Sequence, residues 1–357
     1  MGTHANRKDA RSTGIDLTAL TRLLQRDLPA AATTPLHAEL LTGGRSNLTY
    51  LIRNDTNRWV LRQRPLGHAL ATARDSAREF HILAALAPTR VPVPEVILFH
   101  PDPEPLGSPF YLMEEIAGTV YRTRADTAEL GARRAEALSF ALIDTLADLH
   151  TVDVRKAGLD SVGKPLGYLE RQLDRWSAQL ASTHSRELPD LDRLRQRLSA
   201  TLPPDHPGTI VHGDYRLDNT IIDANDRIAA VLDWELATIG HPLADLGLFA
   251  VHWADLPELP DSPLAGGVRA AAGFTPLPDL IDRYATRTGT DLTDLPWCTA
   301  FGYFKAAAIL EGLHYRHLPG SAIAADTARA GEFVRPLAAQ GLAELAQSGT
   351  SPGHRTR

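Results

Sequence analysis

Cysteine is almost absent from the sequence, since Cys298 is the only one in 357 residues. A single thiol excludes an intramolecular disulfide and a metal site built from several cysteines. No run approaches the roughly 20 apolar residues of a membrane-spanning helix. The first 14 residues are polar and lack the apolar segment of a secretion signal. We therefore expect a cytoplasmic protein without a membrane partner.

The sequence also lacks an excess of positive charge. The chain has 37 Lys and Arg against 43 Asp and Glu, which gives a net charge of -6 at pH 7, and no basic run stands out. This charge gives no electrostatic reason to expect a nucleic acid partner. Hydrophobic residues at 43% and charged residues at 22% are typical of a globular protein, long enough here for one large domain or two moderate ones.

In the first third of the chain, the spacing of turn residues is typical of an antiparallel sheet. Short strand-like runs alternate with turn signals such as Gly43-Gly44 and "NDTN". The expected order is a leading helix, three strands, a helix and two strands, at residues 16–25, 38–44, 47–53, 58–64, 71–86, 94–100 and 109–116.

The rest of the chain is predicted to be mainly helical. In residues 135–150 the side chains of Leu138, Leu142, Leu146 and Leu149 form an apolar stripe at helical spacing. A hairpin of strands 219–223 and 227–234 interrupts the helices, and residues 295–316 are again helical and apolar. The pattern predicts an α+β protein with a small β lobe followed by a larger α lobe.

The stretch "VHGDYRLDN" at 211–219 contains several polar residues that could take part in catalysis or bind a metal ion. Asp214 and Asn219 lie five positions apart, and Asp233 ends the second strand of the following hairpin. Carboxylate and amide oxygens suit Mg²⁺ when phosphates and waters complete its coordination. The order Asp, Asn, Asp is that of phosphoryl-transfer enzymes, in which the first Asp accepts the hydroxyl proton and the other two residues hold magnesium.

That order makes demands on the β lobe: a glycine turn over the phosphates, a cation on the third strand and a helix glutamate as its partner. Gly43 and Gly44 in "TGGRSN" permit close backbone approach. Ser46 and Asn47 of the same turn carry groups that can donate to phosphate oxygens.

On the third strand, Val60 and Arg62 share one face because strand side chains alternate. Val60 is expected to line an adenine pocket and Arg62 to reach the phosphates, with Glu79 on the next helix as its partner. The backbone of "LMEEI" at 112–116 is expected to meet the adenine edge, which adds the candidates Met113, Glu114 and Ile116.

At this point the sequence resembles the aminoglycoside phosphotransferase and choline kinase-like family of the protein-kinase-like superfamily. The resemblance is closest to the branch also found fused to acyl-CoA dehydrogenase-type domains. It rests on a set of stretches between about residues 40 and 250: "GGRSNLTYLI", "VLRQRP", "REFHILAAL", "VPVPEV", "LADLH", "HGDYRLDN" and "VLDWELATIGHPLADLG".

The resemblance implies a bilobal kinase that uses ATP or GTP with Mg²⁺ and phosphorylates a hydroxyl of a small molecule. It assigns Asp214 as the base, Asn219 and Asp233 as magnesium ligands, and Asp245 as a brace for the catalytic loop. The expected organisation is a flexible N-terminus, a nucleotide-binding lobe, a catalytic and substrate lobe, and a flexible tail, at 1–14, 15–116, 117–347 and 348–357.

The sequence departs from protein kinases at two places. Arg62 stands where their third-strand lysine is expected, and an arginine forks instead of presenting one point charge. The turn "GGRSN" lacks their Gly-x-Gly-x-x-Gly spacing, and no Ala-Pro-Glu segment follows "LDWE". A small-molecule acceptor is therefore favoured over a protein substrate.

Two other functions stay open at this stage. His212, Asp214 and Asp233 could hold the metal of a hydrolase, although the template gives His212 a structural role. Arg62 in place of lysine also fits a catalytically inactive module that binds a ligand. The acceptor is open between an aminoglycoside-like antibiotic, a hydroxyacyl thioester and another metabolite, and the oligomeric state is undetermined.

Overall fold

The computed structural model describes residues 14–29, 33–41, 47–64, 73–183, 186–254, 269, 271–316 and 329–348. The chain packs as two compact units. Unit 1 comprises Met1–Ala117 and Ala229–Glu235, and unit 2 comprises Gly118–Ile228 and Leu236–Arg357. Unit 1 therefore takes back a short segment from the middle of the chain, the one that contains Asp233.

Unit 1 is built on a five-stranded antiparallel sheet with the strand order β1-β2-β3-β5-β4. The elements follow the predicted order of helix, three strands, helix and two strands. They are α1 (Leu17–Asp27), β1 (His37–Leu40), β2 (Leu48–Arg53), β3 (Arg58–Gln63), α2 (Ala73–Leu86), β4 (Val96–His100) and β5 (Phe110–Glu114).

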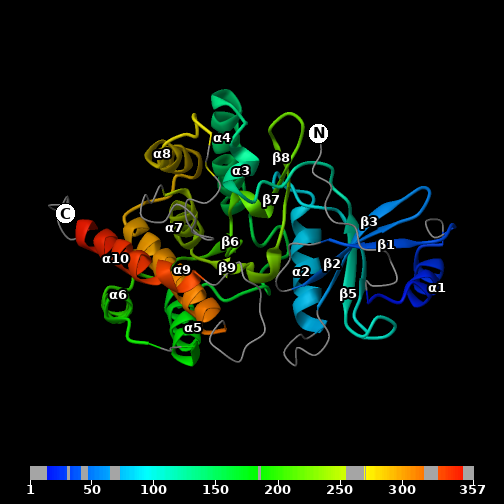
Figure 1. The fold of residues 1–357 in the computed structure, drawn as a ribbon, viewed down its shortest axis with the longest axis horizontal. Coiled ribbons are helices and arrows are strands. Elements are labelled where there is room, and N and C mark those ends of the chain that lie inside the picture. Colours follow the sequence, from blue (N-terminus) through cyan, green and yellow to red (C-terminus); the bar gives the residue numbers. More distant parts are fainter. Residues whose placement is uncertain are drawn as a thin grey trace. The chain divides into compact units, whose positions relative to one another are not determined.

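The two faces of this sheet contact different parts of unit 1. Tyr50, Leu61 and Leu112 face a core that is closed by leucines of α1. The Asp16 carboxylate caps α1 by accepting a 2.9 Å hydrogen bond from Ala19 N. In Figure 1, α1 and α2 lie on opposite sides of the sheet. The face toward α2 is therefore the one that carries Arg62, as strand alternation predicts.

Unit 2 is mainly helical. Its helices are α3 (Arg124–Thr127), α4 (Ala132–His150), α5 (Tyr168–Thr183), α6 (Pro189–Ala200), α7 (Pro242–Trp253), α8 (Leu277–Thr288), α9 (Leu295–Arg316) and α10 (Ala330–Ser348). The predicted stripe of α4 is buried, with Leu138, Leu142, Leu146 and Leu149 all inaccessible to solvent. Within the described ranges, every helix is too short or too polar to cross a lipid bilayer.

Short strands flank the loop that contains Asp214. The predicted hairpin is β7 (Thr220–Ile222) and β8 (Ile228–Val231), with a turn in which Asp223 N donates to Arg227 O. The sequence did not predict β6 (Thr209–Val211) and β9 (Thr238–Gly240), which pair antiparallel. Two single-turn 3₁₀ helices, Leu217–Asn219 and Trp234–Leu236, complete the segment.

Gly247 sets the contact between α7 and α9. A Cβ at this position would lie 2.5 Å from the carbonyl carbon of Cys298, so we expect Gly247→Ala to destabilise the protein by about 1 to 3 kcal/mol through overpacking. Gly312→Ala in α9 is the matched control, because its nearest neighbour would be 3.8 Å away. Thermal unfolding of both variants checks the prediction, and an unchanged melting temperature of Gly247→Ala contradicts it.

Candidate functional site

Arg62 is the centre of an ion-pair cluster in unit 1. Its Nε lies 3.2 Å from Glu79 Oε1, its Nη2 donates to Asp233 Oδ1, and the same nitrogen lies 4.0 Å from Glu235 Oε2. The Arg62 side chain is largely buried. Burial by itself would lower the pKa of Arg62, but the attraction of Glu79 and Asp233 outweighs it and raises that pKa. The guanidinium is therefore a permanent cation.

Glu79 is the buried partner that the sequence predicted for Arg62. Its side chain is only 4% exposed, and burial raises its pKa even though Arg62 and a hydrogen bond from Tyr111 act in the opposite direction. Tyr111 stands opposite Arg62 in the β3/β5 register. The neighbouring strand thus supplies a second contact that holds the glutamate.

Asp233 and Glu235 approach this cluster from the segment that returns to unit 1. Asp233 has a φ of 66°, a left-handed conformation that is uncommon for residues other than glycine and that Asp226 in the β7–β8 turn also adopts. Glu235 O accepts a 2.7 Å hydrogen bond from Arg78, and its side chain accepts one of 3.3 Å from Asn47. The segment is fixed to both α2 and the start of β2.

The other nucleotide-site candidates of unit 1 lie on or beside β5. Val60 stands opposite Met113 in the register, and both are buried. The backbone N–H of Glu114 is used by Glu95 O, and its side chain accepts from Glu95 N. Ile116 is half-buried. Of the predicted phosphate turn, Asn47 is described, whereas Gly43, Gly44 and Ser46 lie outside the described residues.

In unit 2 the loop around Asp214 is held by Asp245 of α7. Asp245 Oδ2 accepts a 2.5 Å hydrogen bond from His212 N, and its Oδ1 accepts one of 2.8 Å from Gly213 N. His150 Nε2 lies 3.3 Å from Oδ2. Burial alone would raise the pKa of Asp245, but its contacts with His150 and His212 lower it. These are the bracing contacts that the family resemblance implied.

Asn219 is attached to Asp214 by two hydrogen bonds. Its Nδ2 donates to the Asp214 carbonyl at 2.8 Å and to Asp214 Oδ2 at 3.1 Å. Because both bonds use the amide nitrogen, the carbonyl oxygen of Asn219 is the atom left for a cation. Oxygen ligands of this kind fit Mg²⁺, and the carboxylate of Asp233 in unit 1 is of the same class.

Asp214 has two further basic neighbours, Arg216 of its own motif and His252 of α7. Arg216 Nε lies 3.4 Å from Asp214 Oδ2 and 3.1 Å from Asp218 Oδ1. His252, in the last turn of α7, places Nε2 3.8 Å from Asp214 Oδ1. Burial would raise the pKa of Asp214, but Arg216, His252 and Lys305 lower it. The side chain is therefore a carboxylate at neutral pH.

His212 is buried against the backbone of the loop. Its side chain is inaccessible to solvent, and its Nδ1 accepts a 3.2 Å hydrogen bond from Asp214 N. The described residues contain no group of three or more His, Cys, Asp or Glu arranged to hold a metal ion. The hydrolase alternative built on His212, Asp214 and Asp233 stays a hypothesis.

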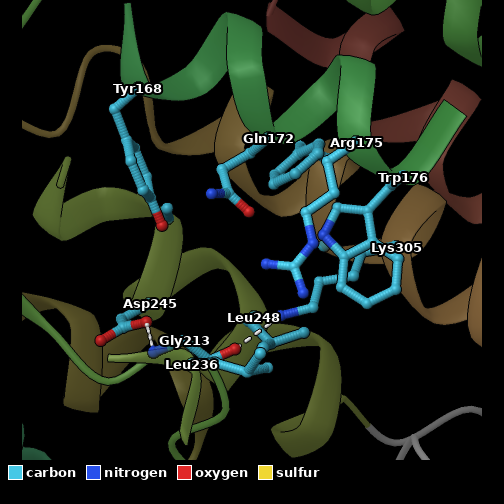
Figure 2. A pocket seen from close by; sticks show the side chains of 12 residues that line it. Tyr168, Gln172, Arg175, Trp176, Gly213, Leu236, Asp245, Leu248 and Lys305 are labelled. Carbon is cyan, nitrogen blue, oxygen red and sulfur yellow. Dashed lines mark hydrogen bonds between the residues drawn. The ribbon is translucent and has the colours of Figure 1, made fainter. Parts of the chain in front are cut away.

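A pocket lies beside the same loop, entirely within unit 2 (Figure 2). It has a volume of about 20 Å³ and is lined by residues of α5, α7 and α9 and by Gly213. Lys305 of α9 reaches into it and donates a 2.5 Å hydrogen bond to Gly213 O. Neither this lysine nor His252 was a candidate from the sequence, although each is one of the few ionisable residues of a mainly apolar helix.

The fold and the loop geometry agree with the chain's matches to known proteins. Residues 37–285 match the Phosphotransferase enzyme family, and the chain belongs to that family. Among curated proteins, the acyl-CoA dehydrogenase family member 11 of Gallus gallus is 36% identical over 337 residues. That match covers 92% of this chain but 43% of the relative, so the chain spans less than half of that fusion protein.

Two solved structures share the architecture. A putative aminoglycoside phosphotransferase from Ralstonia eutropha is 31% identical, with a TM-score of 0.81 and coverage of 93% of this chain and 99% of that chain. Choline kinase from Cryptosporidium parvum is 12% identical, with a TM-score of 0.66 and coverage of 94% and 97%. The predicted kinase-like fold and the family resemblance are both confirmed.

The buried cation in unit 1 makes a testable contribution to stability. We expect Arg62→Met to destabilise the protein by about 3 to 5 kcal/mol, because Glu79 is left buried without a counter-charge. Arg58→Met on the same strand is the matched control. It removes an exposed pair with Glu115 and should cost no more than about 1 kcal/mol. Urea unfolding measures both changes.

The loss in Arg62→Met should also depend on pH. Without its partner, Glu79 has a folded pKa raised further above its unfolded value, so the stability that it contributes is present at low pH and is lost as the pH rises. The gap between the variant and wild type should therefore narrow from neutral toward acidic pH. A gap that widens on acidification contradicts this account of the cluster.

Proposed function

We propose that the chain is a kinase of small molecules, which moves the γ-phosphoryl group of ATP or GTP to a hydroxyl group. The observation that carries the proposal is the contact of Asp214 with Asn219 in a loop anchored by Asp245. Family membership supports the same chemistry. The site residues predicted from the sequence keep their assignments within this proposal.

In the proposed reaction the acceptor hydroxyl oxygen attacks the γ-phosphorus as the bond to the β–γ bridging oxygen breaks. The nucleoside diphosphate leaves, and the hydroxyl proton passes toward Asp214. Because the pKa of Asp214 is lowered, the carboxylate is a weak base that chiefly orients the hydroxyl. This role suits a loose transition state, in which proton transfer comes late and positioning dominates.

The nucleotide would be held by unit 1. Val60 and Met113 form the apolar wall proposed for the base, with Glu114 and Ile116 at its edge. Arg62 supplies the fixed positive charge for the phosphates, with Glu79 as its anchor, and Asn47 and the turn Gly43, Gly44 and Ser46 would contact the same groups. One fold relative, 17% identical, has been solved with GDP and kanamycin, which supports a purine nucleotide as donor.

Mg²⁺ would be held by Asn219 and Asp233, and it would supply charge neutralisation on the transferring phosphoryl group. The oxygen left on Asn219 supports this assignment.

The names of two similar proteins suggest two different classes of phosphate acceptor. The relative from Gallus gallus carries the name of an acyl-CoA dehydrogenase family, which points to hydroxyacyl thioesters. The Ralstonia eutropha structure is described as a putative aminoglycoside phosphotransferase. The inactive-module alternative rests only on Arg62, and the cation retains ion pairs with both Glu79 and Asp233.

Asp214→Asn tests the central role. Phosphoryl transfer should fall by at least about a hundredfold, because the amide cannot accept the hydroxyl proton, while nucleotide binding is retained. Asp223→Asn, in the turn after β7, is the matched control and should keep full activity. An ATP-consumption assay over a panel of hydroxyl compounds gives the rates, and calorimetry gives the nucleotide affinity. Near-normal turnover of Asp214→Asn would refute the assignment.

His252 is proposed as a positioning residue that fixes the orientation of Asp214 through Oδ1. We expect His252→Ala to lower kcat by about tenfold, in line with the loss of one orienting contact, with little change in the KM for nucleotide. His252→Gln should restore part of the rate by placing a side-chain N–H donor near Oδ1. His37→Ala, at the exposed first residue of β1, is the control. An unchanged kcat in His252→Ala would exclude this role.

A further inference from the structure

The pocket beside the catalytic loop has several hydrogen-bond donors among its lining side chains. Figure 2 shows Gln172 and Arg175 of α5 pointing toward Lys305 of α9 and the Gly213 loop. The Nζ of Lys305 uses one donor on Gly213 O and has three in total. Arg175 places its guanidinium 5.5 Å from the Trp176 ring centroid. Two cationic side chains thus converge on one small space.

Trp176 provides an independent indication that a ligand belongs in this space. The side chain is 6% exposed, and its Nε1–H has no hydrogen-bond partner among the described residues. A buried donor without an acceptor costs about 1 to 3 kcal/mol, so such groups are normally satisfied. A bound oxygen acceptor in the pocket would satisfy it.

Asp245 is the acidic residue of the pocket, and its carboxylate is directed at the backbone of the catalytic loop. Both oxygens of Asp245 accept hydrogen bonds from backbone N–H groups, and His150 is close to one of them. Burial lowers the pKa of Lys305, and Arg175 and Arg216 act in the same direction, against Asp214 and Asp245. A bound anion would relieve the repulsion between these cations.

The size of the pocket limits what it can take. Its volume of about 20 Å³ exceeds the roughly 10 to 15 Å³ that one water-sized group requires. A carboxylate group fits this scale, whereas a sugar ring does not. Gly213, which lines the pocket, directly precedes Asp214 in the chain, so a group in the pocket is close to the proposed catalytic residue.

We propose that this pocket binds the carboxylate of the phosphate acceptor through Arg175, Lys305 and the Nε1–H of Trp176, and that the acceptors are hydroxy acids. This inference rests on the proposed kinase function and narrows its substrate class. Charge-assisted hydrogen bonds are about twice as strong as neutral ones, so the carboxylate gives both affinity and selection. Polycationic acceptors are disfavoured by the same two side chains.

Binding to the pocket is measurable without turnover. The probes are butyrate, butanol and butylammonium, which share a carbon chain and differ in the charge of the end group. In full-length protein with ¹⁵N-labelled tryptophan, the indole N–H resonance of Trp176 is assigned as the signal lost in Trp176→Phe. We expect butyrate to shift this resonance saturably and the other two probes to leave it in place.

Arg175→Gln tests the cation that is safest to remove, because its side chain is exposed. It should weaken butyrate binding by about tenfold, as expected for the loss of one charge-assisted contact. Arg193→Gln, on an exposed position of α6, is the matched control and should bind butyrate as wild type does. No shift with butyrate, or an equal shift with butanol or butylammonium, overturns the inference.

Turnover separates this inference from the function on which it rests. The acceptors are 3-hydroxybutyrate, butane-1,3-diol and 4-aminobutan-2-ol, again matched in skeleton. Preferential phosphorylation of the hydroxy acid, with its KM raised in Arg175→Gln and the KM for ATP unchanged, supports both proposals. Preference for the diol or the amine overturns the hydroxy-acid assignment alone. Butyrate binding without phosphorylation of any acceptor counts against the kinase function and leaves the carboxylate pocket supported.

Discussion

The catalytic loop of unit 2 depends on one buried carboxylate. Asp245 accepts the backbone N–H groups of His212 and Gly213, and a buried charge without such donors would be strongly destabilising. The loop and the carboxylate therefore hold each other in place. Gly213 has a φ of 83°, and a Cβ there would lie 2.8 Å from the Leu236 side chain. The backbone immediately before Asp214 consequently has little freedom to move.

Gly213 is held through both of its backbone polar groups. Its N–H donates to Asp245, and its carbonyl accepts from Lys305. Lys305 in turn lies 5.2 Å from the Trp176 ring centroid. Asp245 of α7 and Lys305 of α9 therefore contact Gly213 directly, and α5 packs against Lys305 through Trp176. The same contacts that orient Asp214 also shape the neighbouring pocket. Recognition of an acceptor end group and alignment of the catalytic carboxylate are thus physically connected through Gly213.

In unit 1 a single cation on β3 contacts several carboxylates, and arginine suits this arrangement better than lysine. The Arg62 guanidinium meets Glu79 through Nε and Asp233 through Nη2, with Glu235 also within 4.0 Å. A lysine presents one compact charge and could not spread these contacts over separate nitrogens. Within the described residues, three acidic side chains thus lie around this guanidinium, and Arg78 contacts the Glu235 carbonyl. In the proposed function, a divalent cation would add positive charge beside these carboxylates.

Sequence reasoning succeeded where a pattern has a period or matches a known motif, and it missed contacts that depend on helix packing. Alternation along β3 placed Val60 and Arg62 on one face, and the register against β5 agrees. In contrast, β6 and β9 have three residues each, too few for a period to be visible. The placement of His252 beside Asp214 and of Lys305 beside Gly213 arises from helix packing, which local patterns do not encode.

A charged residue inside an apolar helix was nevertheless a signal that could have been used, because a buried charge requires a partner. Lys305 and Glu311 in α9 carry the same signal, and both are buried. Their partners differ in kind. Lys305 contacts the catalytic loop, whereas Glu311 pairs with Arg186 at 2.7 Å. The sequence therefore indicates that each charge is paired, and only the packing of α9 against α5 and the loop determines which of the two belongs to the site.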